Sequence, residues 1–129
     1  MMICVSAVAD SLDAQVDPRF GRCPYFVIVD SETMEFEAVP NTASSHMGGA
    51  GIQAAQTVAS KGVNVVLTGN VGPNAFQALS ATGIKVLTGV FGTVRKAVER
   101  YKRGELKEAG SPTVRGHFGM GRSRGRRSR

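Results

Sequence analysis

The pattern of apolar residues changes near residue 49, and this change constrains the fold more than any other feature of the chain. Before it, strand-like runs follow one another with no helical period; after it, short apolar runs alternate with helix-like segments. Strand–helix alternation is typical of parallel pairing, whereas a tight hairpin is antiparallel. We therefore predict an α/β fold with a mixed sheet of five strands, in the order β-β-β-α-β-α-β-α. The expected helices lie at 49–61, 74–82 and 93–103, and the strands after residue 49 at 63–67 and 84–87.

The first part of the chain contains three expected strands. Residues 2–8 form a short apolar run with β-branched side chains, and residues 25–29 form the clearest strand. Residues 34–39 alternate apolar and polar, as a half-buried strand should, and the turn at 30–33 makes these last two strands a hairpin. Between the first two strands, residues 9–22 are polar and read as a long loop, in which three aspartates look like solvated charges. These are Asp10, Asp13 and Asp17.

Capping and helix-breaking residues indicate the ends of the expected helices. Gly62 and Gly83 are helix stops, Pro73 suits the first turn of the second helix, and Thr93 is a good N-cap for the third. The inward face of the first helix is expected to carry Ile52, Ala55, Val58 and Ala59. The inward face of the second is expected to carry Phe76 and Leu79.

The charge of the chain is unevenly distributed. The formal net charge of the 129 residues is +6, but residues 1–110 hold ten basic and ten acidic residues, which cancel. The other six basic residues, all arginines, lie beyond residue 110 with no acid among them. We expect one domain over 1–108 and a disordered basic Gly/Arg-rich tail over 109–129. The tail could bind nucleic acid weakly through phosphate charge, attract an anionic cofactor or acidic partner, or be simply solvated.

Two cysteines do not make a disulfide framework in a chain of this size, and no apolar run approaches a membrane span. No basic segment followed by a long apolar run suggests a signal peptide. A cytoplasmic protein with reduced thiols and no membrane association is the expectation. Neither a Ser-His-Asp order nor a paired carboxylate site stands out, so we expect no enzyme.

The loop at residues 41–51 is the candidate functional site. Gly48, Gly49 and Gly51 allow a ligand to approach the backbone closely, and the helix start behind them suits an anion. The dinucleotide fingerprint is a poor match, because the glycines lie about ten residues past the strand end. His46 in the same loop is either a solvated loop residue or a ligand. The residues of this loop therefore argue against a nucleotide and leave open whether it holds a metal cluster or no ligand.

Two further loops are expected at the same edge of the sheet. The loops at 68–74 and 88–92 follow parallel strands, whose carboxyl ends converge on one crevice. Gly69, Gly72 and Asn74 are therefore candidate binding residues, unless they merely supply turn geometry.

Cys23 is the candidate soft ligand. It follows Arg19 and Arg22, and a thiolate near two arginines would have a lowered pKa and bind metal better. Cys4 lies within a strand, where a buried cysteine commonly acts as a small hydrophobe. The spacing of these cysteines with His46 is not that of a structural zinc site, and no compact cluster-binding run is present. His117 and Met120 in the tail could also reach a soft metal.

Several motifs, in this order and spacing over about residues 2–105, resemble the dinitrogenase iron–molybdenum cofactor biosynthesis family. This family includes NifX and the carboxyl-terminal domain of NifB. The motifs are Arg19-Phe20-Gly21-Arg22, Pro24-Tyr25-Phe26, Asn41 with Gly48-Gly49-Ala50-Gly51, Gly72-Pro73-Asn74-Ala75-Phe76, and Gly83-Ile84-Lys85.

The resemblance implies a ribonuclease-H-like fold without nuclease residues, and a non-enzymatic carrier or chaperone role. Its cargo would be an iron–sulfur or iron–molybdenum–sulfur cluster, bound transiently. Glycine-loop N–H groups, helix starts and Arg19 and Arg22 would cradle such an anion, while Cys23 and His46 would supply metal ligands. Partners would be metallocofactor assembly or acceptor proteins, and the protein would be a monomer or weak homo-oligomer. The alternative is a nucleic-acid-binding module acting through the tail.

Overall fold

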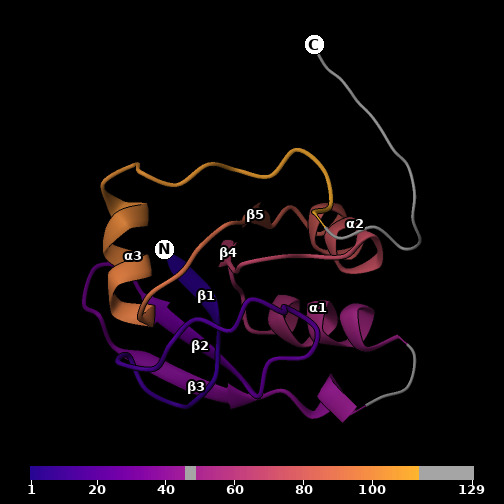
Figure 1. Cartoon of the computed structure of the whole chain (residues 1–129), viewed down its shortest axis with the longest axis horizontal. Helices are drawn as coiled ribbons and strands as arrows, with labels where there is room; N and C mark the ends of the chain where they lie inside the picture. The colour runs from indigo at the N-terminus through magenta and orange to yellow at the C-terminus, as the bar shows by residue number, and fades with distance from the viewer. Residues whose placement is uncertain (46–48, 114–129) are drawn as a thin grey trace.

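The computed structural model describes residues 1–45 and 49–113, and its centre is a five-stranded mixed sheet in the order β3-β2-β1-β4-β5 (Figure 1). The central strand β1 pairs antiparallel with β2 and parallel with β4, which pairs parallel with β5. The predicted mixed sheet, its element order and its ribonuclease-H-like arrangement are confirmed. The strands are β1 (Met2–Ala7), β2 (Tyr25–Asp30), β3 (Phe36–Pro40), β4 (Val65–Leu67) and β5 (Lys85–Leu87).

The helices cover both faces of the sheet, as Figure 1 shows. α1 (Ala50–Ser60) and α2 (Pro73–Ala81) lie on one face, and α3 (Val94–Lys102) lies on the other. Side chains alternate between the two faces of a strand. In β1, Ile3 and Val5 therefore pack on the side of the sheet covered by α3, and Cys4 packs on the side covered by α1 and α2. A 3-10 turn, η1 (Thr42–Ser45), follows β3. No helix in the described parts of the chain is long and apolar enough to cross a membrane.

The buried face of α1 differs from the expected one. Ile52 is 38% exposed, while Ala50 and Ala54 are buried together with the expected Ala55 and Val58. The helix packs against α2 as well as against the sheet, so the small residues face inward where two neighbours approach. The amphipathic period predicts the helix correctly, but the predicted inward face is rotated about the helix axis relative to the observed one. In α2, Leu79 is buried as expected, and Phe76 is only partly buried.

The predicted helix ends are confirmed. Gly62 and Gly83 follow the first two helices with φ of +72° and +80°, values that glycine adopts without strain. Pro73 is the first residue of α2, and the hydroxyl of Thr93 accepts a hydrogen bond from the N–H of Lys96 at 3.1 Å. Local signals therefore set these boundaries. The parallel pairing of β1 with β4 places the loops that follow these two strands at one edge of the sheet.

The end of the described chain runs beside β5 and then reaches the loop after β4. The N–H of Ala109 donates to the carbonyl of Val86 at 2.7 Å, and the N–H of Thr113 donates to the carbonyl of Val71 at 2.9 Å. Residues 109–113, which were expected in the tail, thus hydrogen-bond to the body of the protein. The rest of the predicted tail, 114–129, lies outside the described residues.

Candidate anion site at the carboxyl edge of the sheet

The loop that follows β1 runs along the loop that follows β4. Arg19 forms a parallel bridge with Asn70, and the N–H of Asn70 donates to the carbonyl of Pro18 at 2.7 Å. Gly69 lies so close to this segment that an added Cβ would be 2.7 Å from the Cα of Pro18. The 88–92 loop joins them, since the N–H of Gly89 donates to the carbonyl of Gly69 at 2.9 Å. The expectation that these loops converge is confirmed for 68–74 and 88–92.

The same β1 loop then crosses the start of α1 (Figure 1). A Cβ added at Gly21 would lie 3.2 Å from the Cα of Gly51, and one added at Gly51 would lie 3.2 Å from the Cβ of Ala75. Gly21 therefore contacts the start of α1, and the start of α1 contacts the first turn of α2. The glycines permit this close approach of backbone to backbone.

Neither of these two helix starts has a capping side chain. The N-cap residues are Gly49, with φ of +74°, and Gly72, whose φ of −80° is ordinary. The first hydrogen bonds within the helices are donated by Gln53 and Phe76, so the N–H groups before them have no acceptor in their own helix. α3, whose start is capped by Thr93, differs in this respect. Two neighbouring uncapped starts provide donors and positive dipole ends for an anion.

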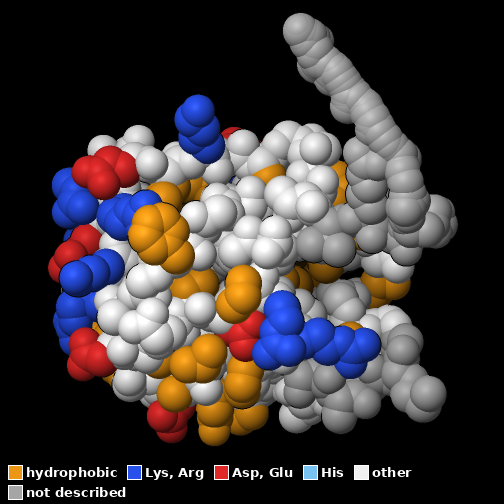
Figure 2. Space-filling view, in the orientation of Figure 1, with side chains coloured by type: hydrophobic (Ala, Val, Ile, Leu, Met, Phe, Trp, Pro, Cys, Tyr) orange, Lys and Arg blue, Asp and Glu red, His pale blue; other side chains and the backbone are white. Residues whose placement is uncertain are grey.

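Arg19 adds a fixed positive charge at this edge. Its Nε and Nη2 atoms donate to Oδ1 and Oδ2 of Asp17, each at 3.1 Å, and this hydrogen bonding raises the pKa of Arg19. The Arg19 side chain is 64% exposed, whereas that of Asp17 is 3% exposed. Figure 2 shows basic side chains projecting where the loop after β1 passes in front of α1. Arg22, the other predicted cation, is also exposed.

Asp17 is therefore not the solvated charge that its loop position suggested. Its carboxylate is buried, and it accepts three N–H donors from Arg19, including the backbone N–H at 2.9 Å. The spacing Asp-Pro-Arg is the signal that could have indicated this role, because an aspartate can accept a hydrogen bond from the backbone N–H two residues on. The other two aspartates of the loop remain at the surface or partly exposed.

Cys23 is buried, contrary to the expectation of a reactive thiol in a loop. Its side chain has no exposed surface, and its Sγ–H donates to the carbonyl of Phe20 at 3.3 Å. Burial, followed by the nearby charge of Asp17, raises the pKa of Cys23 to about 12. The prediction of a lowered pKa is wrong, because desolvation outweighs any arginine nearby. Direct metal ligation by Cys23 stays a prediction, and it requires the thiol to leave this position.

Asn41, at the end of β3, joins the two halves of the candidate site. Its Nδ2 donates to the carbonyls of Cys23 at 2.8 Å and Gly21 at 3.2 Å, and its Oδ1 accepts from the N–H of Ala43. The side chain is 5% exposed. Asn41 thus ties the 21–23 turn to the segment that leads into α1, a role that its place in the family motif did not reveal.

Two of the predicted site residues, His46 and Gly48, lie outside the described residues, as do His117 and Met120. Of the others, Gly51 and Gly69 lie at tight backbone contacts, whereas an added Cβ at Gly72 would meet nothing within 4 Å. Asn74 is exposed in the first turn of α2. Among the described residues, no three His, Cys, Asp or Glu side chains are grouped as metal ligands.

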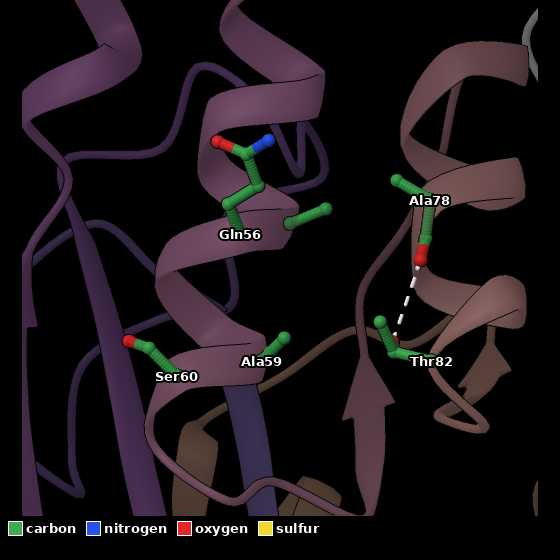
Figure 3. A pocket seen from close by; sticks show the side chains of 6 residues that line it. Gln56, Ala59, Ser60, Ala78 and Thr82 are labelled. Atoms are coloured by element: carbon green, nitrogen blue, oxygen red, sulfur yellow. Dashed lines mark hydrogen bonds between the residues drawn. The ribbon is translucent and has the colours of Figure 1, made fainter.

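A groove of about 330 Å³ lies between α1 and α2, away from this edge (Figure 3). Ala59 and Ala78 project toward the gap between the helices, and the Thr82 hydroxyl donates to the carbonyl of Ala78 at 3.4 Å. The lining residues carry no charge that would attract an anion. They are Ala55, Gln56, Ala59, Ser60, Ala78 and Thr82.

Comparison with known proteins gives a consistent result. A family model described as dinitrogenase iron-molybdenum cofactor matches residues 1–104. An uncharacterized protein of Methanocaldococcus jannaschii is 32% identical over 97 residues, covering 73% of this chain and 82% of that protein. The apo form of the orange protein from Desulfovibrio gigas aligns with a TM-score of 0.86 and 49% identity, over 88% of this chain and 96% of that one. A Thermotoga protein provisionally labelled NifB aligns with a TM-score of 0.77 and 36% identity, over 88% and 97%.

Proposed function

The chain belongs to the dinitrogenase iron-molybdenum cofactor family, and from that membership we propose that it is a non-enzymatic carrier of an anionic metal–sulfur cluster during metallocofactor assembly. The cargo is an iron–sulfur or a molybdenum-containing sulfur cluster. The observation that supports the proposal is a run of close contacts: Gly21 of the 19–22 loop lies against the start of α1, and the start of α1 lies against the first turn of α2. Neither of these two helix starts has a capping side chain.

This arrangement suits an anion that is held and then released. Helix-start N–H groups and arginines stabilise negative charge without forming covalent bonds. Resident iron–sulfur clusters are instead usually held by several cysteine thiolates. The one cysteine near the loops is buried with a raised pKa, so electrostatic attraction is the main source of affinity. Cys23 and His46 remain proposed ligands that would add to it.

A carrier needs an exposed site rather than a set of catalytic groups. Arg19 and Arg22 are exposed at the edge where α1 and α2 begin. The partners that we propose are the assembly and acceptor proteins that deliver and receive the cluster, in the cytoplasm, with the carrier acting as a monomer or weak homo-oligomer. The likeness to the apo form of the orange protein supports a protein that exists with and without a bound group.

The test is anaerobic incubation with tetrathiomolybdate, or separately with iron and sulfide, followed by desalting, metal analysis and visible absorbance. We expect retained metal and colour in the wild type. Arg19→Ala and Arg22→Ala should each reduce retention, and Cys23→Ser and His46→Ala should reduce it less. The control is Arg103→Ala, which removes an equal charge from an exposed side chain paired with Glu105 beyond α3. The proposal is contradicted if the wild type retains neither molybdenum nor iron. It is also contradicted if Arg103→Ala lowers metal retention as much as Arg19→Ala and Arg22→Ala do.

A further inference from the structure

We propose that Asp17 is a positioning residue, which holds the guanidinium of Arg19 in the orientation that the anion needs. The inference rests on the proposed function and adds a residue to its site. Asp17 lies behind Arg19, away from solvent, and its contribution is the geometry of the arginine rather than a contact with the cargo.

The two side chains meet in a fork. Oδ1 of Asp17 accepts from Nε of Arg19, and Oδ2 accepts from Nη2, each at 3.1 Å. A guanidinium has five N–H donors, and the carboxylate uses two of them. The other three N–H groups of the guanidinium are left for other acceptors. Because the buried carboxylate of Asp17 already holds one side of the guanidinium, Arg19 loses little rotamer freedom when an anion binds on the other side.

Asp17 is itself held by the sheet. Its N–H donates to the carbonyl of Ser6 at 2.8 Å, and its own carbonyl accepts from the Ser6 hydroxyl at 2.6 Å. The Ser6 hydroxyl is 2.7 Å from that of Thr68, which follows β4. Ser6 and Thr68 have no exposed surface. The chain of contacts therefore runs from the two parallel strands β1 and β4 through Asp17 to an exposed arginine.

The change in anion affinity on neutralising Asp17 has one sign if Asp17 orients Arg19 and the opposite sign if only its charge matters. Asp17 is a negative charge near the candidate anion site, so its neutralisation alone would strengthen anion binding. If its main effect is to orient Arg19, its neutralisation weakens binding although the site becomes more positive. If Asp17 served only to form the turn, by accepting the backbone N–H of Arg19, the Asp17→Asn variant would keep that role. The Oδ1 atom of asparagine can still accept this hydrogen bond.

The experiment compares Asp17→Asn with Asp13→Asn in titrations with tetrathiomolybdate under anaerobic conditions. Asp13 lies in the same loop, its side chain is 81% exposed, and its change removes the same charge. We expect Asp17→Asn to weaken binding about tenfold, the order of one charge-assisted hydrogen bond lost. Asp13→Asn should leave binding unchanged or slightly tighter. Equal affinity of the two variants, or tighter binding by Asp17→Asn, overturns the inference.

Two further measurements keep the test decisive. In an Arg19→Ala background, Asp17→Asn should no longer weaken binding, because the arginine that it positions is absent. The Nη2–H signals of Arg19 in ligand-free protein should exchange with water more slowly in the wild type and in Asp13→Asn than in Asp17→Asn, because asparagine replaces the Oδ2 acceptor of Nη2 with an NH2 group. If Asp17→Asn does not fold, Arg19→Lys tests the fork from the exposed side: it keeps the charge, and wild-type affinity would overturn the inference. A wild type that binds no tetrathiomolybdate and no iron–sulfur cluster overturns the proposed function as well.

Discussion

Gly69 lies against Pro18 so closely that any β-carbon at position 69 would overlap it. The built Cβ is 2.7 Å from both the Cα and the Cβ of Pro18 and 3.2 Å from its carbonyl oxygen. The contact joins the loop after β4 to the loop that carries Asp17 and Arg19. Packing therefore explains why residue 69 is a glycine. Its contact with Pro18 fixes the position of the loop that carries Arg19 relative to the start of α2.

Gly69→Ala should lower the free energy of unfolding by about 1–3 kcal/mol, because the new methyl group must push the Pro18 backbone away. The matched control is Gly72→Ala, three residues later. There a Cβ meets nothing within 4 Å and φ is −80°, so we expect a change within about 1 kcal/mol: the lower entropy of the unfolded chain stabilises, while alanine is a poorer N-cap than glycine. Urea denaturation of both variants measures the difference, and equal stability would contradict the packing argument.

Asn41→Ala should destabilise the protein and loosen the candidate site. The substitution leaves the buried carbonyl of Cys23 without the donor at 2.8 Å, at a cost of about 1–3 kcal/mol. Retention of tetrathiomolybdate should fall at a temperature where the variant is still folded, because the 21–23 turn is no longer tied to β3. Thr93→Ala is the control: loss of the N-cap of α3, a helix on the other face of the sheet from α1 and α2, costs about 1 kcal/mol and should leave retention unchanged. Equal retention by the two variants would show that Asn41 only stabilises the fold.

The thiol of Cys23 should be protected from reaction and should make the fold sensitive to alkali. Burial raises its pKa to about 12 in the folded state, from an ordinary value of 9.0. Below pH 9 the thiol is neutral in both states, so this contribution to stability is fully present. It is lost as the pH rises from about 9 to about 12, at up to about 1.4 kcal/mol per pH unit. Urea denaturation from pH 8 to pH 11 measures the slope, which Cys23→Ala should reduce.

Cys4 contributes in the same direction, because burial raises its pKa well above the usual value. At pH 8, an aromatic disulfide reagent should therefore modify neither thiol in the folded protein and both in urea. Rapid modification of Cys23 in the folded wild type would contradict the buried position and would favour direct metal ligation.

A chain that ends at Thr113 should bind anions less tightly and with weaker dependence on salt. Thr113 is held by the N–H and carbonyl of Val71, next to the start of α2, so the arginines that follow join the protein beside the candidate site. Removal of residues 114–129 removes six arginines and no acid. Because those charges attract an anion, the slope of log affinity against log salt should become shallower. A chain that ends at Gly121, which keeps Arg115, should lie between the two, and identical slopes would contradict the prediction.

The order of elements could be read from the sequence because strands and helices have different local periods. The boundaries at Gly62, Gly83 and Thr93 followed from single residues whose backbone or hydroxyl properties act within a few positions. The convergence of the 68–74 and 88–92 loops followed from the rule that parallel strands share a carboxyl edge. Arg19 and the glycines of the 41–51 loop are predicted site residues because of their charge and backbone freedom, and their place in the family motif agrees with that prediction.

The burial of the site residues could not be read in the same way. Cys23 follows a polar stretch of sequence, but its thiol is buried and hydrogen-bonds to the carbonyl of Phe20. Asp17 lies in a polar loop, but its backbone is hydrogen-bonded to Ser6 of β1 and its side chain is only 3% exposed. Burial and pKa depend on groups that are distant along the chain and near in space. By itself, the sequence determined the elements, their order and the edge that carries the loops, since these depend on local periodicity and chirality. Only the tertiary structure decided that Asp17 and Arg19 form one unit and that Cys23 lies in the core, because desolvation is a property of the packed state.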